Sequence, residues 1–317
     1  NVKNKEISLY EAENLLIATG ARPFIPNIDG AKYALTSSDV LSLEEVPSKL
    51  NIVGGGIIAT ELSNIFSSFG SEVKIIARSE ILKELEPEIK SYVVKKLINE
   101  VDIYENTNVL EITENSIITD KGEFEGKTLI ATGRVPNSEI VKDMVDLNED
   151  ESIKVNEFFQ TSNPNIYAAG DVTGGITLTP YARKEGISAA RNMAGYLNKF
   201  DEIIVPQSLT LDLDVSFTQK TKSDEDESDN VEDVIIPGLG GPHAFWRILR
   251  GETGITKVSL NSETEEIVRA SQISPSSIDD TAYLAFPMNM GITKEDFDDF
   301  LEVHPSTDAY YKILKIM

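Results

Sequence analysis

Short apolar runs along the chain alternate with longer segments in which apolar residues recur every three or four positions. Residues 50–53 form such a run, and three glycines and an apolar pattern with a period near 3.6 follow it as far as Gly70. A second strand-like segment, EVKIIA, comes next at residues 72–77. The pattern predicts a strand, a helix and a second strand, which together form one βαβ unit of about 30 residues.

One strand ending occurs twice, on either side of this unit. LLIATGARP begins at Leu15 and TLIATGRVP begins at Thr128, and both combine an apolar run, Ala-Thr-Gly and a following Arg and Pro. Because the two copies bracket the βαβ unit, the simplest geometry is a domain inserted between two strands of a host domain. A third apolar strand ending, NIYAAGD at residues 165–171, precedes a helical pattern at residues 179–198.

The order of these patterns predicts an α/β fold in three parts. The host domain is expected at residues 1–46 and 134–200, and the inserted domain, a parallel sheet covered by helices, at residues 47–133. Alternating strands followed by a compact α+β tail predict a third domain at residues 203–317.

Charge narrows the range of partners. The chain carries 53 acidic and 29 basic residues, which gives a formal net charge of −24. Such a charge repels phosphate backbones and anionic lipid, so neither nucleic acid nor a membrane surface is an expected partner. The run SDEDESDNVED lies within an expected acidic loop at residues 222–233, which is interpreted as an exposed insertion or, alternatively, as a docking tail.

The counts of cysteine and histidine narrow the chemistry. The chain has no Cys, so any redox disulfide must lie elsewhere, and its 2 His are too few for a histidine-based metal site. No apolar run approaches the roughly 20 residues of a membrane helix. The first residues lack a signal peptide, and a cytoplasmic protein is therefore expected.

Three small residues mark the junction between the first strand and the helix of the βαβ unit. Gly54, Gly56 and Ala59 fit the pattern G-x-G-x-x-A. In a dinucleotide-binding turn the first glycine allows the tight turn, the second lets a pyrophosphate approach backbone N–H groups, and the small third residue permits close helix packing. A glycine turn without a ligand is the alternative, but the βαβ frame favours nucleotide binding at the helix N-terminus.

The end of the second strand indicates which nucleotide is bound. A carboxylate at this position accepts the ribose hydroxyls of NAD, whereas a basic residue accommodates the additional phosphate of NADP. Ala77 stands where the acid is expected, Arg78 follows it, and Lys83 is close behind. These residues favour NADP, with NAD as the alternative if Arg78 is a surface residue offset by Glu80.

Gly170 and Asp171 end the third apolar strand. A carboxylate at a strand end beside a helix N-terminus can accept hydrogen bonds from a polyol, such as the ribityl chain of a flavin. Gly-Asp alone is not specific, but it gains weight from the two Ala-Thr-Gly strands and from TPYARKEG downstream.

Four ordered motifs resemble those of one enzyme family. They are LLIATGARP, IVGGGIIATEL, TLIATGRVPN and NPNIYAAGDV, with VHPSTD near the C-terminus. In this order they resemble the class I pyridine nucleotide-disulfide oxidoreductase family, which includes dihydrolipoamide dehydrogenase, glutathione reductase and mercuric reductase. The resemblance covers nearly the whole chain, and IIARSEIL is most similar to the NADP-using mercuric reductase branch.

This resemblance implies cofactors, a partner and further site residues. FAD is expected mainly in the host domain, with Asp171 on its ribityl or phosphate part, and the third domain is expected to form a homodimer. Glu61 matches a family glutamate close to the nicotinamide and the flavin. The other residues expected to hold a cofactor are Ala18, Thr19, Gly20, Ala131, Thr132, Gly133, Arg134, Gly170 and Thr179.

His304 is the residue to which the resemblance gives proton transfer. It is expected to reach the active site of the partner subunit and to act as acid and base for a thiol or substrate, a role that a near-neutral pKa suits. The family places a Glu five positions after this His, where this chain has Ala309, and Asp308 is the nearest carboxylate. The orienting partner is thus either replaced by Asp308 or lost, and a loop histidine without chemistry is the alternative.

The motifs with which members of this family begin are not found in the given sequence, which starts at Asn1. Members begin with a strand, a G-x-G-x-x-G loop that holds the ADP half of FAD, and a helix with two redox cysteines. The chain is therefore expected to be an N-terminally truncated piece of a longer enzyme, with an incomplete FAD-binding domain, and a protein that has lost flavin chemistry is the alternative.

The leading hypothesis is an oxidoreductase that passes hydride from NADPH to FAD and then electrons to a disulfide or another acceptor. One alternative is a nicotinamide nucleotide-binding protein without catalysis, and another is an oxidase or transhydrogenase that uses no disulfide. The sequence names no acceptor, because family members with similar cofactor domains reduce very different substrates.

Overall fold

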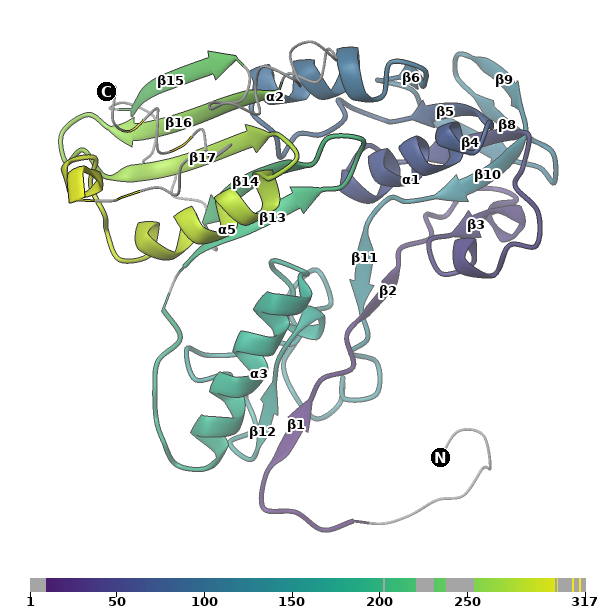
Figure 1. The fold of residues 1–317 in the computed structure, drawn as a ribbon. Helices are drawn as coiled ribbons and strands as arrows, with labels where there is room; N and C mark the ends of the chain where they lie inside the picture. Colours follow the sequence, from purple (N-terminus) through teal and green to yellow (C-terminus); the bar gives the residue numbers. More distant parts are fainter. Residues whose placement is uncertain are drawn as a thin grey trace. The chain divides into compact units, whose positions relative to one another are not determined.

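A computed structural model describes residues 10–201, 203–220, 231–237 and 254–299, together with the single residues 301, 310 and 314. The chain forms two compact units, drawn in Figure 1. One comprises residues 1–22 and 134–201, and the other comprises residues 23–133 and 202–317.

The larger unit contains a five-stranded parallel sheet with the strand order β3-β10-β4-β5-β6. Its central strands are almost wholly buried because both faces of a parallel sheet are covered. The strands are β3 (Leu35–Thr36), β4 (Lys49–Val53), β5 (Glu72–Ile76), β6 (Asp102–Tyr104) and β10 (Lys127–Ile130).

Helix α1 (Ile57–Ser68) connects β4 to β5 and completes the predicted βαβ unit. Its buried face consists mostly of small side chains, Ala59, Thr60 and Ser63, which let the helix lie close to the sheet. The helix stops at Phe69 because Gly70 takes a left-handed conformation, with φ of 91°. Further along, Pro87 begins the short helix α2 (Pro87–Tyr92), which continues into a π-helical turn (Val93–Leu97).

Two smaller groups of elements belong to the same unit. The first is an antiparallel three-stranded sheet of β7 (Val109–Ile112), β8 (Ser116–Thr119) and β9 (Gly122–Glu125). The second is a pair of 3₁₀ helices, Ala31–Tyr33 and Val40–Ser42.

The rest of the larger unit is an antiparallel five-stranded sheet with the order β13-β14-β17-β16-β15, called the interface sheet below. Helix α5 (Ser277–Met288) packs on one face, where Val258, Ala270 and Leu284 lie in a common core. The opposite face adds Val215, Phe217 and other side chains to the core of the parallel sheet. The strands are β13 (Ile204–Leu209), β14 (Val215–Lys220), β15 (Val231–Pro237), β16 (Ile255–Asn261) and β17 (Ile267–Ile273), and a 3₁₀ helix (Glu295–Asp299) follows α5.

The expected acidic loop ends earlier than the sequence predicts. Residues up to 233 were expected to be a loop, but β15 begins at Val231 and pairs with β16. Two observations explain the strand. Val234 and Ile236 pack against the core under α5, and the carboxylate of Asp233 lies 2.8 Å from the Lys257 ammonium.

The smaller unit is built on the parallel pair of β1 (Leu15–Ile17) and β12 (Ile166–Ala168). After β12 come a 3₁₀ turn (Asp171–Thr173) and helix α3 (Thr179–Met193). The helix ends before the predicted residue 198, because Gly195 takes a left-handed conformation, with φ of 85°. Strands β2 (Ala21–Pro23) and β11 (Arg134–Pro136) pair where the chain leaves and re-enters this unit.

The predicted α/β fold, with a parallel sheet and a separate antiparallel α+β part, is confirmed. The domain limits remain a prediction. Strand β3 at residues 35–36 pairs with β10 in the parallel sheet, although it precedes the expected start of the inserted domain at residue 47. Among the described residues, no helix has the length and apolar character needed to cross a membrane.

Candidate functional site: a nucleotide-binding turn and a flavin-type strand end

The turn between β4 and α1 needs Gly54 for structural reasons. Gly54 has φ of 136°, a conformation that residues with a side chain rarely adopt. A Cβ atom there would lie 2.2 Å from the carbonyl oxygen of Ala131, which follows β10. The structure thus brings together two residues of the predicted cofactor site, and the fold alone accounts for the glycine.

Gly56 has a different environment. Its φ of −90° and ψ of −171° suit any residue, and the nearest atom to an added Cβ would be Glu84 Oε1 at 3.8 Å. The backbone therefore does not require a glycine here, and the space that a side chain would occupy at this position is open. This opening fits the pyrophosphate of a dinucleotide, which approaches the backbone closely at such a glycine. An exposed acidic residue, Glu84, lies beside this opening.

The basic residues of the loop after β5 are exposed. Arg78 and Lys83 form no ion pair with any other residue in the described part of the chain. The carboxylate of Glu80 lies 3.2 Å from the Lys90 ammonium, so Glu80 is paired with Lys90 instead of Arg78. Both positive charges of the loop are thus available to an anionic ligand such as a phosphate.

The loop is fastened to the glycine turn. Leu82 is fully buried and has φ of 47°, and its N–H donates to the carbonyl of Gly55 at 2.6 Å. The N–H of Ile81 donates to Glu105 Oε1 at 2.8 Å. A buried leucine in a left-handed conformation is strained, and it persists because the surrounding contacts hold it. Arg78 and Lys83 therefore lie on a loop of defined shape.

Glu61 lies one turn beyond the glycines, on α1. Its Oε1 accepts a hydrogen bond from the N–H of Thr210, the residue after β13, at 2.8 Å. Partial burial raises the pKa of the Glu61 carboxyl, and the bond from Thr210 partly offsets this effect. The predicted position of Glu61 beside the nicotinamide and the flavin stays a prediction.

In the smaller unit, Arg134 and Asp171 lie together. The Nε atom of Arg134 is 3.8 Å from Asp171 Oδ2, and the guanidinium also donates to the carbonyl of Ala21. Asp171 begins the 3₁₀ turn, and its side chain is partly exposed. A partly exposed carboxylate can accept hydrogen bonds from hydroxyl groups, so this strand end fits the predicted contact with a flavin's ribityl chain.

The first Ala-Thr-Gly strand ending is fastened by Asn137. The hydroxyl of Thr19 donates to the Asn137 carbonyl at 2.7 Å, and the side-chain amide of Asn137 donates back to the Thr19 carbonyl at 2.9 Å. Ala18 is exposed beside them, and Gly20 has φ of 68°. These residues form an ordered edge at the carboxyl end of β1.

The second Ala-Thr-Gly ending is held by Phe24 in the larger unit. Thr132 donates its hydroxyl to the Phe24 carbonyl at 3.0 Å, and the Phe24 N–H donates to the carbonyl of Gly133 at 2.9 Å. Thr179, the remaining predicted contact, is the exposed first residue of α3 in the smaller unit.

Glu185 contacts the candidate site at Gly170 and was not among the residues predicted from the sequence. It is buried on α3, where its Oε2 accepts the N–H of Gly170 at 2.6 Å and lies 3.4 Å from the Thr173 hydroxyl. Burial raises the pKa of Glu185 to about 7, the bonds from Gly170 and Thr173 oppose this, and the charge of Asp171 adds to it. Its signal in the sequence is a charged residue on the buried face of α3, in line with Ala189 and Asn192.

The predicted proton-transfer residues His304 and Asp308 lie outside the described residues. The structure brings Gly54 to Ala131 in the larger unit and Arg134 to Asp171 in the smaller one. It also places Gly56, Arg78 and Lys83 at the carboxyl ends of neighbouring parallel strands, which is the edge where α/β sheets bind ligands.

Known proteins are similar to this chain in sequence. The chain is 32% identical over 308 residues to a mercuric reductase of Lysinibacillus sphaericus, which covers 92% of this chain and 56% of that protein. It is 32% identical over 316 residues to a dihydrolipoyl dehydrogenase of Bacillus subtilis, which covers 94% of this chain and 68% of that protein. This chain thus spans little more than half the length of the mercuric reductase.

A solved structure has the same fold. The HOCl-induced flavoprotein disulfide reductase RclA of Escherichia coli superposes with a TM-score of 0.85 at 25% sequence identity, over 96% of this chain and 73% of that one. Residues 1–186 match the family model described as pyridine nucleotide-disulphide oxidoreductase. This match covers more than half of the chain and includes the glycine turn, both Ala-Thr-Gly strand endings and Asp171. The chain belongs to the pyridine nucleotide-disulphide oxidoreductase family.

Proposed function

We propose that this chain is part of a flavin-dependent oxidoreductase that takes hydride from NADPH through FAD and passes electrons to a disulfide or another acceptor. The observation that carries the proposal is the glycine turn at β4 beside a loop with two exposed cations, neither of which has an ion-pair partner among the described residues. Gly56 leaves the space that a pyrophosphate needs, and Arg78 and Lys83 offer charge to the additional phosphate of NADP.

The residues of the chain bind and orient the cofactors in this proposal. The N–H groups at the start of α1 hold the pyrophosphate, Arg78 and Lys83 select the phosphorylated ribose, and Asp171 accepts hydroxyl groups of FAD. The flavin, when bound, supplies the hydride and electron chemistry that no side chain can perform.

Two further roles follow from the family. Glu61 is proposed to lie near the nicotinamide, where partial burial and the bond from Thr210 fix its orientation. His304 is proposed to hold and release the proton of the acceptor, with Asp308 as its orienting carboxylate. The enzyme is further proposed to be a cytoplasmic homodimer formed by the third domain.

An absorption experiment tests the proposal. The purified chain is incubated with excess FAD, separated from free flavin by gel filtration, and then mixed with NADPH or NADH without oxygen. We expect a retained flavin band that bleaches faster with NADPH than with NADH.

Each result in this experiment has a defined meaning. A retained flavin that responds equally to both nucleotides would reject the role of Arg78 and Lys83. A colourless chain that binds NADPH would support the proposed nucleotide site but not a flavin site in this chain. A chain that binds neither cofactor would contradict the proposed function.

A further inference from the structure

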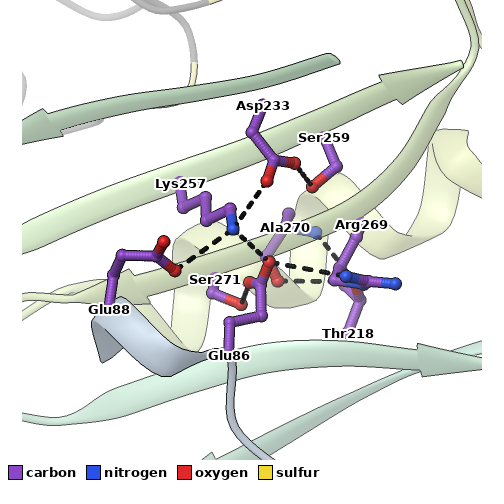
Figure 2. A network of polar contacts seen from close by, with 9 residues as sticks. All are labelled: Glu86, Glu88, Thr218, Asp233, Lys257, Ser259, Arg269, Ala270 and Ser271. Carbon is purple, nitrogen blue, oxygen red and sulfur yellow. Dashed lines mark hydrogen bonds and ion pairs between the residues drawn. The ribbon is translucent and has the colours of Figure 1, made fainter. Parts of the chain in front are cut away.

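The interface sheet carries a buried cation, Lys257 on β16, whose side chain is only 5% exposed. Its ammonium lies between three carboxylates: 3.0 Å from Glu86, 3.2 Å from Glu88 and 2.8 Å from Asp233. Figure 2 shows Asp233 reaching it from β15 and the two glutamates reaching it from the segment that enters α2. Lys257 thus joins the interface sheet to the nucleotide-binding part of the same unit.

Glu86 is the most constrained of the three carboxylates. Its side chain is 9% exposed, and besides Lys257 it meets Arg269 at 3.5 Å and accepts the hydroxyl of Ser271 at 2.6 Å. Arg269 and Ser271 both belong to β17 of the interface sheet. Every polar partner of Glu86 in Figure 2 therefore comes from the interface sheet.

The charges keep this arrangement in place. Burial lowers the pKa of Lys257, but the bonds to Asp233, Glu86 and Glu88 outweigh it, so the pKa is raised and the ammonium stays charged. The three carboxylates together exceed the two cations Lys257 and Arg269 by one charge. A buried charge is costly unless its partners are in place, so releasing Glu86 from Lys257 and Arg269 would leave a buried carboxylate without these two cations.

Glu86 is also the last residue of the loop that carries the proposed NADP-selecting cations. It precedes Pro87 at the start of α2 and is eight positions after Arg78. The middle of the loop is held by the buried Leu82, whose N–H donates to Gly55. The loop thus has two anchors beyond Arg78, one on the glycine turn and one on the interface sheet.

We propose that Glu86 and Lys257 are positioning residues for this loop and that they determine how strongly the chain prefers NADPH to NADH. The inference rests on the proposed function, because it assumes that Arg78 and Lys83 contact the additional phosphate. The preference depends on the position of two long side chains relative to a phosphate at the glycine turn. Releasing the end of the loop lets these side chains move and weakens a contact that only NADPH makes.

The test is calorimetric titration of the chain with NADPH and with NADH. Glu86→Gln removes the charge of the anchor with little change in shape, and Arg78→Gln removes the proposed phosphate contact. Lys49→Met is the matched control, since it removes an exposed ion pair with Glu125 in the same unit, at the opposite end of β4. Thermal unfolding of each variant shows whether it is folded.

We expect Glu86→Gln to raise the dissociation constant for NADPH about tenfold and to leave that for NADH nearly unchanged. Lys257→Arg, which keeps the positive charge, should retain more of the preference than Lys257→Met. Lys49→Met should leave the dissociation constants of both nucleotides unchanged. If Lys257→Met fails to fold, Glu86→Gln still decides the result.

This experiment distinguishes a failure of the positioning role from a failure of the proposed function. Suppose that Arg78→Gln removes the NADPH preference, whereas Glu86→Gln leaves both dissociation constants unchanged or raises both by the same factor. The positioning role is then wrong and the proposed function stands. If the unmodified chain binds both nucleotides alike, or binds neither, the proposed NADP specificity and the positioning role are both overturned.

Discussion

At the scale of single residues, Gly54 and Gly56 of the proposed nucleotide-binding turn have different structural roles. The fold requires Gly54, because a side chain would meet the carbonyl of Ala131 and because its φ is positive. The fold does not require Gly56, since an added Cβ would meet no atom closer than 3.8 Å. Stability and nucleotide binding should therefore respond separately to the two positions.

Gly54→Ala should lower the free energy of unfolding by about 3 kcal/mol through steric overlap and backbone strain. Gly56→Ala should cost no more than about 1 kcal/mol, the usual difference between glycine and alanine at a helix N-cap. It should nevertheless weaken NADPH binding at least about tenfold, because the methyl group occupies the path of the pyrophosphate. Chemical denaturation measures the first quantity and calorimetric titration the second. Unimpaired NADPH binding by Gly56→Ala would remove this turn from the site.

Glu185 provides a prediction about pH. Its pKa of about 7 lies above the usual value of 4.5, so the folded state binds a proton more tightly than the unfolded state. The stability that comes from the neutral carboxyl is complete below about pH 4.5 and is lost as the pH rises through 7. The loss amounts to about 3 kcal/mol at most.

Glu185→Gln should remove this part of the pH dependence, since the amide stays neutral and still accepts the N–H of Gly170. The measurement is urea denaturation between pH 5 and 8, for the chain and the variant. Asp143→Asn, at an exposed position of the same unit, is the control. An unchanged pH profile in Glu185→Gln would show that the carboxyl is ionised throughout this range.

At the scale of elements, the contact between α2 and the interface sheet depends on charge balance. Lys257→Met leaves Glu86 buried, and among the described residues Arg269, at 3.5 Å, is then its cationic partner. Removing one partner of a buried ion pair typically costs about 3 kcal/mol, whereas removing both costs much less. The double variant Lys257→Met with Glu86→Gln should therefore be more stable than Lys257→Met alone.

A double-mutant cycle in urea tests this expectation, with Glu86→Gln alone as the fourth member. The coupling energy between the two positions should be on the order of 1–2 kcal/mol. Additive losses would mean that Lys257 is sufficiently balanced by Glu88 and Asp233 and does not depend on Glu86.

At the scale of the whole molecule, the net charge of −24 should destabilise the folded state through self-repulsion. Raising the ionic strength from about 10 mM to about 150 mM shortens the screening length from about 30 Å to about 8 Å. The unfolding temperature should therefore rise with added NaCl, because repulsion between exposed carboxylates is screened. Scanning calorimetry measures the unfolding temperature. A fall in this temperature with added NaCl would show that the attraction within surface ion pairs outweighs the repulsion.

Local patterns in the sequence were enough to predict the elements that carry the proposed cofactor site. The period near 3.6 after Gly56 gave helix α1, and the repeated Ala-Thr-Gly endings marked the strands β1 and β10. These predictions succeed because apolar spacing reflects burial, and because a glycine at a turn reflects a backbone conformation that few other residues adopt. Both are properties of neighbouring residues.

Only the tertiary structure decided which distant groups meet. The sequence does not show that Ala131 closes over Gly54, that Glu86 reaches Lys257, or that Asp233 belongs to a strand instead of an acidic loop. Nor does it show that Glu185 is buried with a raised pKa. The physical reason is the same in each case. The energy of a charged group, and the space around a glycine, depend on atoms that strand order and packing bring together from far along the chain.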